Sequence, residues 1–356
     1  MRVLTRSKTP VDPNPSLERG KREECLATFW HQATPGTTYW RCLVPARHLP
    51  GQSLPFTPTD LKEKRGTPYL PRQKGDTAVW QFLGDETRTR VAMGMAEIHK
   101  YRTLMELDDN YLRHAPYQYG KANTPWRRTR AEAKGGYSHE MHRLCTPWMD
   151  GLIVSTDFLA NAYEDYNANI RVCPNSVDPD DWEYEREEHD AFRIVYYGSP
   201  SHGVDAPLVT DALKWAARQP GVEVWTVGFR NPAWSFPHQS IPWGSDLVEA
   251  RKHLFKFDLG IAPLKTNDWA NGKSDVKALE YAMAGVCPLV QDAEPFKAWE
   301  GVVPMPKHKG DWVESIRWAV QNPDEVKAFA QHAKDYVLKE RTIQSSIHLW
   351  RKAVDG

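Results

Sequence analysis

Short apolar runs alternate with amphipathic segments along most of the chain. The runs predict buried strands, and segments with apolar residues three and four positions apart predict helices. The first series of predicted strands comprises residues 78–83, 102–107, 151–155 and 170–173. The helices predicted within this series comprise residues 87–101, 131–144 and 156–166. Thr156 is suited to cap the last of these helices.

The same alternation begins again at residue 192. The second series of predicted strands comprises residues 192–197, 222–227, 258–264 and 286–290. The predicted helices comprise residues 206–219, 247–255, 273–284, 311–320, 324–338 and 343–354. Strands that alternate with helices form parallel sheets with helices on both faces. We therefore predict an α/β protein with two Rossmann-like, doubly wound domains.

Residues 176–191 separate the two series. Their sequence, SVDPDDWEYEREEHDA, is acidic and rich in turn-forming residues, which is typical of an interdomain linker. This places a first domain at residues 1–175 and a second domain at residues 192–339. Proline and glycine are frequent in residues 9–75, so we expect long loops there, with at most a short strand at residues 39–44.

The composition narrows the class of protein. A chain of 356 residues is longer than one hydrophobic core usually serves. Its 15 Trp, 14 Tyr and 11 Phe residues exclude a mostly disordered chain. No apolar run reaches the roughly 18 residues of a membrane-spanning helix, and residues 1–25 have no apolar signal core. The five cysteines lack CxxC spacing, which favours a reducing compartment. We expect a cytoplasmic protein without membrane insertion.

The net charge of zero conceals an asymmetry. Residues 1–150 contain 24 Lys and Arg against 16 Asp and Glu, and the acidic excess lies in the remainder of the chain. A basic half of a neutral protein indicates an anionic partner. Ordinary scatter of surface charge is the alternative.

The loop at residues 198–205 is a first candidate ligand site. In parallel sheets, ligands bind beyond the carboxyl ends of the strands. This loop, GSPSHGVD, leads from a predicted strand to a helix, so the N–H groups at Gly198 and Ser199 would attract phosphate. Glycine turns between strand and helix are also routine connections. In a further loop, Trp243 would stack on a nucleobase or simply pack in the core.

A second candidate site lies at the predicted helix 273–284. On such a helix, Lys273, Lys277 and Glu280 have i, i+4, i+7 spacing and share one face. Lysines in a first turn oppose the helix dipole unless an anion is bound there. A diphosphate would supply that anion, and Glu280 would accept hydrogen bonds from ribose hydroxyls. The alternative is an ion pair between Lys277 and Glu280 on a solvated face.

These segments resemble a known family. GSPSHGVD, GIAPL followed by NGKSDVKALEYAMAG, and VSTDFLANAY with IRVCPNSVD resemble GT-B glycosyltransferases of the glycogen-synthase-like, mostly retaining group, in its compact bacteriophage-type form. The resemblance covers most of residues 77–350. It implies two domains that face a cleft, with a nucleotide-sugar donor in the second domain and an acceptor in the first. It also implies that a last helix at residues 340–356 completes the first domain.

The resemblance further implies a donor site that needs no metal and takes a nucleotide-diphosphate sugar, expected to be a UDP-sugar. Larger members carry two glutamates seven residues apart, and here Lys273 occupies the first position and Glu280 the second. Lys273, Ser274 and Lys277 would then line the donor site. Cations near the leaving diphosphate lower the barrier to transfer. His202 would donate a hydrogen bond to a phosphate oxygen or a sugar hydroxyl.

Asp108 and Asp109 follow the predicted strand 102–107. A carboxylate pair at a strand end can bind a divalent cation with phosphates. It can also orient or deprotonate an acceptor hydroxyl, which we favour because the pair belongs to the first domain. A loop-capping role is a further alternative. Asp109 is our candidate catalytic base.

Residues 121–130, KANTPWRRTR, interleave basic residues with an aromatic ring. Trp126, Arg127 and Arg128 are the kind of residues that stack on bases and bind phosphates. A hydroxylated or hydroxymethylated base in phage DNA is therefore a candidate acceptor, and host cytoplasm a candidate location. A surface glycan, a lipid-linked glycan and a protein hydroxyl are the competing acceptors.

Two other functions fit the same architecture. A nucleotide-sugar epimerase would turn over its substrate without an acceptor. A non-catalytic module would bind nucleotide sugar or DNA and have no activity to lose.

Overall fold

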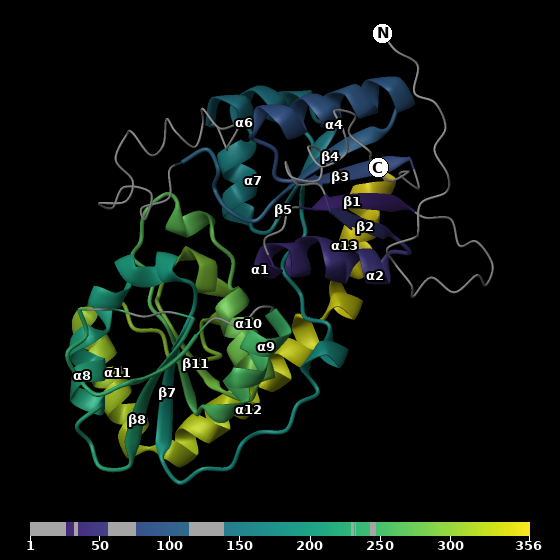
Figure 1. Cartoon of the computed structure of the whole chain (residues 1–356). Coiled ribbons are helices and arrows are strands. Elements are labelled where there is room, and N and C mark those ends of the chain that lie inside the picture. The colour runs from purple at the N-terminus through teal and green to yellow at the C-terminus, as the bar shows by residue number, and fades with distance from the viewer. Residues whose placement is uncertain are drawn as a thin grey trace.

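The computed structural model of the chain has two α/β domains, which lie one above the other in Figure 1. The structure describes residues 26–31, 35–55, 76–113, 139–228, 231, 233–242 and 247–356. Each domain has one sheet, and the paired strands in both sheets are parallel. The prediction of two doubly wound domains is confirmed.

The first domain is built on a six-stranded sheet in the order β2-β1-β3-β4-β5-β6. Its strands are β1 (Ala27–His31), β2 (Gln52–Pro55), β3 (Thr77–Gln81), β4 (Arg102–Leu107), β5 (Gly151–Val154) and β6 (Ile170–Val172). One face is covered by α4 (Glu86–His99), α6 (His139–Cys145) and α7 (Asp157–Tyr163). The other face is covered by α1 (Pro35–Thr38), α2 (Val44–His48) and α13 (Ile343–Asp355), as Figure 1 shows.

Alternate residues of these strands fill two separate apolar clusters, because neighbouring side chains on a strand point to opposite faces. Trp30 of β1 and Trp80 of β3 stack with 5.4 Å between ring centroids on the α4 side. Phe29 lies on the other face, where its ring centroid is 6.0 Å from that of Trp350 in α13. Burial on both faces is typical of a parallel sheet between two helical layers.

The second domain has a five-stranded sheet in the order β11-β10-β7-β8-β9. Its strands are β7 (Phe192–Tyr197), β8 (Val222–Val227), β9 (Gln239–Ile241), β10 (Leu259–Ala262) and β11 (Cys287–Val290). Its helices are α8 (Thr210–Ala216), α9 (Leu247–Lys252), α10 (Val276–Met283), α11 (Lys309–Gln321) and α12 (Pro323–Glu340). Ile194 packs with α8 and α11, whereas Val195 packs with α9 and α10 on the opposite face.

The chain passes between the domains twice, and the two passages lie side by side. Val177 forms a parallel bridge with Thr342, and its N–H donates to the carbonyl of Arg341 at 2.9 Å. The chain then enters α13, which packs against the sheet of the first domain (Figure 1). Arg102 at the start of β4 donates to the carbonyl oxygen of Ala353 at 2.9 Å. The C-terminal helix is thus part of the core of the first domain.

The prediction for residues 39–44 is wrong. Instead of a strand, residues Tyr39–Leu43 form a π-helical turn between α1 and α2. The reason is Arg41, which is fully buried and donates to Glu106 at 2.6 Å, a contact that the local sequence does not reveal. The apolar alternation also fails to predict β1, β2 and β9.

Several predicted helices begin later than expected. The helix predicted at residues 206–219 is observed as α8 from Thr210, after a 3-10 turn at Ala206–Leu208. The helix predicted at residues 273–284 begins at Val276. The one predicted at residues 131–144 is observed as α6 from His139, and residues 131–138 lie outside the described ranges.

Candidate active site

The carboxyl ends of the two sheets face each other, and the candidate site lies between them. In the second sheet, the strand order reverses between β7 and β10. Connections that leave neighbouring strands for opposite faces open a crevice at such a switch point, where ligands of doubly wound folds bind. The loop after β7 begins at Gly198, and the segment after β10 contains Lys273.

Gly198 brings two predicted site residues together. A Cβ atom added to this glycine would lie 2.8 Å from Cδ2 of His202 and 3.1 Å from Nζ of Lys277. Its φ of +153° is a further reason for glycine at this position. The ammonium group of Lys277 therefore lies directly against the main chain at the end of β7.

His202 is held by a carboxylate. Its Nδ1 lies 3.2 Å from Oδ2 of Asp205, and Asp205 also accepts a hydrogen bond from the N–H of Lys265 at 2.8 Å. Burial and the charge of Lys277 together lower the pKa of His202 to about 4, against the opposing effect of Asp205. The imidazole is therefore neutral at pH 7. With the proton on Nδ1, facing the carboxylate, Nε2 is an acceptor.

Lys273 does not share a helix with Lys277, so the predicted helical face of Lys273, Lys277 and Glu280 is wrong. Lys273 has extended backbone angles (φ −73°, ψ 161°) three residues before α10. Its Nζ reaches the other domain and lies 3.2 Å from Oδ1 of Asp109. The helix begins late because Asp275 makes a bidentate ion pair with Arg341, at 2.6 and 3.0 Å.

Lys277 nevertheless lies near Lys273. Burial, opposed by the charge of Asp205 and aided by that of Lys273, lowers the pKa of Lys277 to about 8. Two ammonium groups that repel each other beside a strand end favour a bound anion. The ammonium groups thus lie at the domain junction rather than in bulk solvent.

Glu280 is buried behind these cations, with 3% of its surface exposed. Its carboxylate pairs with Arg251 of α9, with 3.6 Å between Oε1 and Nε. The alternative prediction was an ion pair between Glu280 and Lys277, and the ion pairs among the described residues do not include it. Burial raises the pKa of Glu280 to about 7, although Arg251 and Lys277 lower it.

Asp108 and Asp109 at the end of β4 have different surroundings. Asp108 accepts a hydrogen bond from the hydroxyl of Tyr111 at 2.8 Å and thus serves the local loop. Asp109 faces Lys273. Burial raises the pKa of Asp109 to about 6, while Lys273 lowers it and Asp108 raises it. Asp109 is therefore the carboxylate of this pair that faces the second domain.

No protein-family model and no curated protein matches the sequence, but solved structures match the fold. Sucrose-phosphate synthase from Thermosynechococcus elongatus aligns with a TM-score of 0.61 and 11% identity, over 92% of this chain and 98% of that one. HepE from Anabaena, in complex with UDP and glucose, aligns with a TM-score of 0.61 and 11% identity, over 93% and 100%. TarM aligns with a TM-score of 0.55 and 9% identity over 79% of this chain, and the chain spans only 55% of the length of TarM.

These neighbours share the two Rossmann-like domains. The chain has the GT-B fold.

Two asparagines at the junction of the GT-B domains were not predicted. Asn175, after β6, donates to Oγ of Ser274 at 2.8 Å and accepts from Arg41 at 3.1 Å. Asn110, after β4, donates to the carbonyl of Asp268 at 3.1 Å. Each asparagine follows a predicted strand of the first domain, and that position is the signal that could have found it.

Several predicted residues lie outside the part of the chain that the structure describes. These are Trp126, Arg127 and Arg128 of the basic segment, and Trp243 of the proposed base-stacking loop.

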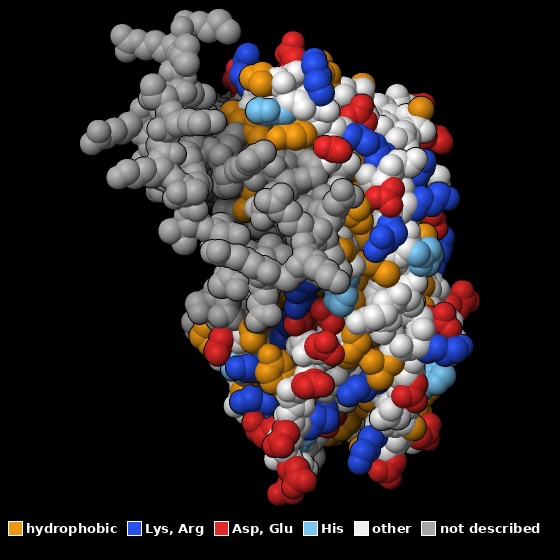
Figure 2. Space-filling view, turned by 90° about the vertical axis from the view of Figure 1, so that its right-hand side faces the viewer, with side chains coloured by type: hydrophobic (Ala, Val, Ile, Leu, Met, Phe, Trp, Pro, Cys, Tyr) orange, Lys and Arg blue, Asp and Glu red, His pale blue; other side chains and the backbone are white. Residues whose placement is uncertain are grey.

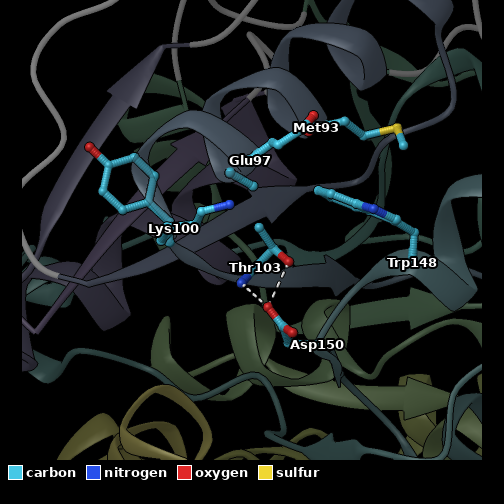
Figure 3. Close-up of a pocket in the computed structure, with 8 residues that line it drawn as sticks. Met93, Glu97, Lys100, Thr103, Trp148 and Asp150 are labelled. Carbon is cyan, nitrogen blue, oxygen red and sulfur yellow. Dashed lines mark hydrogen bonds between the residues drawn. The ribbon is translucent and has the colours of Figure 1, made fainter.

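A cavity of about 430 Å³ lies at the opposite, amino-terminal end of β4 and β5 (Figure 3). Trp148 and Glu97 line it. Asp150, a second carboxylate of the lining, accepts hydrogen bonds from the N–H and the hydroxyl of Thr103 at 2.6 and 2.8 Å. That carboxylate therefore ties β4 to β5, and the cavity is separate from the GT-B junction.

Within the described ranges, no three His, Cys, Asp or Glu side chains gather as ligands for a metal. In that same part of the chain, a helix of the length and hydrophobicity needed to span a membrane is absent.

Proposed function

We propose that the chain is a glycosyltransferase that moves a sugar from a nucleoside-diphosphate sugar to a hydroxyl group. The observation that carries the proposal is the position of Lys277 and Lys273. Both cations lie at the β7/β10 switch point of a GT-B fold, and Lys273 faces the carboxylate of Asp109. HepE, which has the same fold, has been solved with UDP and with UDP-glucose, and this supports UDP as the nucleotide.

The cations act on the leaving group. As the bond between the sugar carbon and the phosphate oxygen breaks, its electron pair remains on the diphosphate. The ammonium groups of Lys273 and Lys277 and the main-chain N–H of Ser199 stabilise that charge. Because these groups supply the positive charge, the proposal includes no metal. The expectation that the N–H of Gly198 binds phosphate is wrong, because this group donates to the carbonyl of Val227 at 3.0 Å. Ser274, held by Asn175, belongs to the same site.

The remaining groups bind the donor. Glu280 accepts hydrogen bonds from the ribose hydroxyls, and Trp243 is the candidate ring for the base. His202 presents an acceptor nitrogen, so a hydrogen bond from a sugar hydroxyl is favoured over donation to a phosphate.

Asp109 is the candidate base. The acceptor oxygen forms the new bond to the sugar carbon, and its proton passes to the carboxylate. A group with a pKa near 6 is largely ionised at pH 7 and still accepts a proton readily. When the diphosphate binds Lys273, the Asp109 carboxylate becomes available to the acceptor hydroxyl.

For the acceptor we propose a hydroxylated or hydroxymethylated base in DNA, as in bacteriophages that modify their DNA. The basic excess supports an anionic acceptor. Of the 24 Lys and Arg in residues 1–150, 16 lie in residues 1–25, 56–75 and 114–138, outside the described ranges. On the face in Figure 2, the Lys and Arg of described residues are interspersed with Asp and Glu. A nucleotide-sugar donor and free, buried cysteines are consistent with the cytoplasm.

The test is incubation with a panel of nucleotide sugars and candidate acceptors, followed by mass spectrometry of the acceptors. The panel includes DNA with and without hydroxymethylated pyrimidines, a surface glycan and a protein. A mass gain of one hexose or aminohexose on any acceptor supports the transferase. Conversion of the nucleotide sugar to an epimeric sugar without acceptor, as distinct from simple hydrolysis of the donor, indicates an epimerase. Binding without turnover indicates a non-catalytic module, and either result overturns the proposal.

A further inference from the structure

Arg251 of α9 is a buried cation in an aromatic cage. Only 1% of its surface is exposed. Its Cζ lies 3.7 Å from the ring centroid of Tyr39, 4.8 Å from that of Trp182 and 5.2 Å from that of Trp40. Tyr39 and Trp40 belong to the first domain and Trp182 to the linker, whereas Arg251 belongs to the second domain. Cation–π contacts of this kind stabilise a desolvated guanidinium.

The hydrogen bonding of this guanidinium is incomplete. In the part of the chain that the structure describes, Nε and Nη2 are buried and have no hydrogen-bond partner. The acid that Arg251 pairs with is Glu280, at 3.6 Å. Burying an incompletely hydrogen-bonded cation is costly, so the arrangement indicates a role beyond packing.

Glu280 depends on Arg251 for its charge. The charged or titratable groups that face it are Arg251 from α9, Lys277 and Tyr281 from α10, and Tyr197 from β7. The two tyrosines are neutral at pH 7, since burial raises the pKa of each. Arg251 and Lys277 thus oppose the burial that favours the protonated acid, and Lys277 is directed at Gly198.

We propose that Arg251 is a positioning residue of the donor site, which favours the ionised form of Glu280 and orients it as the acceptor of the ribose hydroxyls. Its cage couples this carboxylate to the first domain. The inference rests on the proposed function, in which Glu280 binds the ribose. An ionised carboxylate accepts from both hydroxyls through either oxygen, whereas a protonated one loses an acceptor site. Without Arg251, the carboxylate takes up a proton at higher pH and donor affinity falls.

The test is calorimetric titration of UDP at pH 7, 8 and 9, with each variant expressed relative to the wild type at the same pH. This ratio removes the titration of the diphosphate and of Lys277. For Arg251→Met we expect about tenfold weaker UDP binding at pH 7 than for the wild type, because the loss of Arg251 raises the pKa of Glu280 and leaves less of this carboxylate ionised. Binding should recover toward pH 9, where Glu280 is ionised again. Arg251→Lys, which keeps the charge, should bind at an intermediate level.

Two comparisons separate positioning from general damage. The Glu280→Gln variant should bind UDP weakly at every pH. Adding Arg251→Met to this variant should weaken UDP binding no further. Arg186→Met is the matched control, because Arg186 is a linker arginine that donates to the carbonyls of Ala284 and Phe257 in the second domain. We expect it to lower the melting temperature without changing the pH dependence of binding.

The inference is overturned if Arg251→Met weakens UDP binding equally at every pH, or if adding Arg251→Met to Glu280→Gln weakens binding by the full factor again. In either case, UDP binding by the wild type still supports the proposed function. If the wild type binds neither UDP nor any other nucleoside diphosphate, the proposed function fails and the inference fails with it.

Discussion

Lys273 and Asp109, from different domains, are joined by an ion pair of 3.2 Å between Nζ and Oδ1. The lysine is a candidate ligand for the donor diphosphate, and the aspartate is the candidate base for the acceptor. The ammonium group of Lys273 cannot fully neutralise both the donor diphosphate and the Asp109 carboxylate. Donor binding should therefore draw Lys273 away from Asp109. The ion pair therefore couples the two half-sites of the proposed reaction.

Removal of Lys273 should affect both partners. We expect Lys273→Met to lower kcat/KM by about 100-fold, the usual effect of losing one group that stabilises transition-state charge. Since Lys273 lowers the pKa of Asp109, its loss should also move the acid limb of the pH–rate profile above pH 6. A profile with an unchanged acid limb would show that Asp109 is not the titrating base.

The two neighbouring aspartates should behave differently. Asp109→Asn should reduce kcat by at least about 100-fold, because a general base contributes that much or more. Asp108→Asn is the matched control, since its carboxylate serves the hydroxyl of Tyr111. We expect it to lower stability modestly and kcat less than tenfold. Equal losses of kcat in both variants would contradict the assignment.

Gly198 offers a test of the donor site by size alone. In Gly198→Ala the new methyl group would displace His202 and Lys277, which lie 2.8 and 3.1 Å from its position. We expect KM for the donor to rise by about tenfold or more. Gly94→Ala is the control, because no atom lies within 4 Å of its added Cβ atom and it lies inside α4. It should stabilise the protein by about 0.5–1 kcal/mol without changing KM.

Strands β7, β8, β10 and β11 of the second domain were predictable from sequence because they are short, mostly apolar runs, whereas β9 was not predicted. Residues 192–197 and 222–227 match β7 and β8 residue for residue. The proximity of Gly198 and Lys277 was also predictable, because one follows β7 and the other begins the helix after the adjacent β10. Strand order thus determines that part of the site.

The remainder of the site depends on contacts between distant residues. The segment before α10 has sufficient helix propensity to predict a helix from Lys273, but the ion pair of Asp275 with Arg341 gives it a different start. Arg41 similarly decides the π-helical turn through Glu106. The bond between Asn175 and Ser274 joins the two domains. Local patterns carry no information about such pairs.

His202 should make stability depend on pH. Its pKa is about 4 in the folded protein and about 6.5 when unfolded, so the unfolded state binds more protons between these values. The contribution of His202 is constant above pH 6.5 and falls by about 3 kcal/mol as the pH is lowered to 4. Denaturant unfolding of the wild type and His202→Gln measures this. The difference between them should shrink toward low pH, and a constant difference would contradict the lowered pKa.

Charge reversal at Arg127 and Arg128 tests the proposed DNA acceptor. Each contact to phosphate contributes to affinity through release of counterions, so the double variant Arg127→Glu/Arg128→Glu should weaken DNA use by about tenfold or more and reduce the salt dependence of DNA binding. Hydrolysis of the nucleotide sugar without acceptor should remain intact, because these residues are assigned to the acceptor. Arg90→Glu is a control, as Arg90 is exposed and pairs with Glu86 on α4. Equal loss of transfer and donor hydrolysis in the double variant would assign the basic segment to the donor site or to folding instead of to DNA.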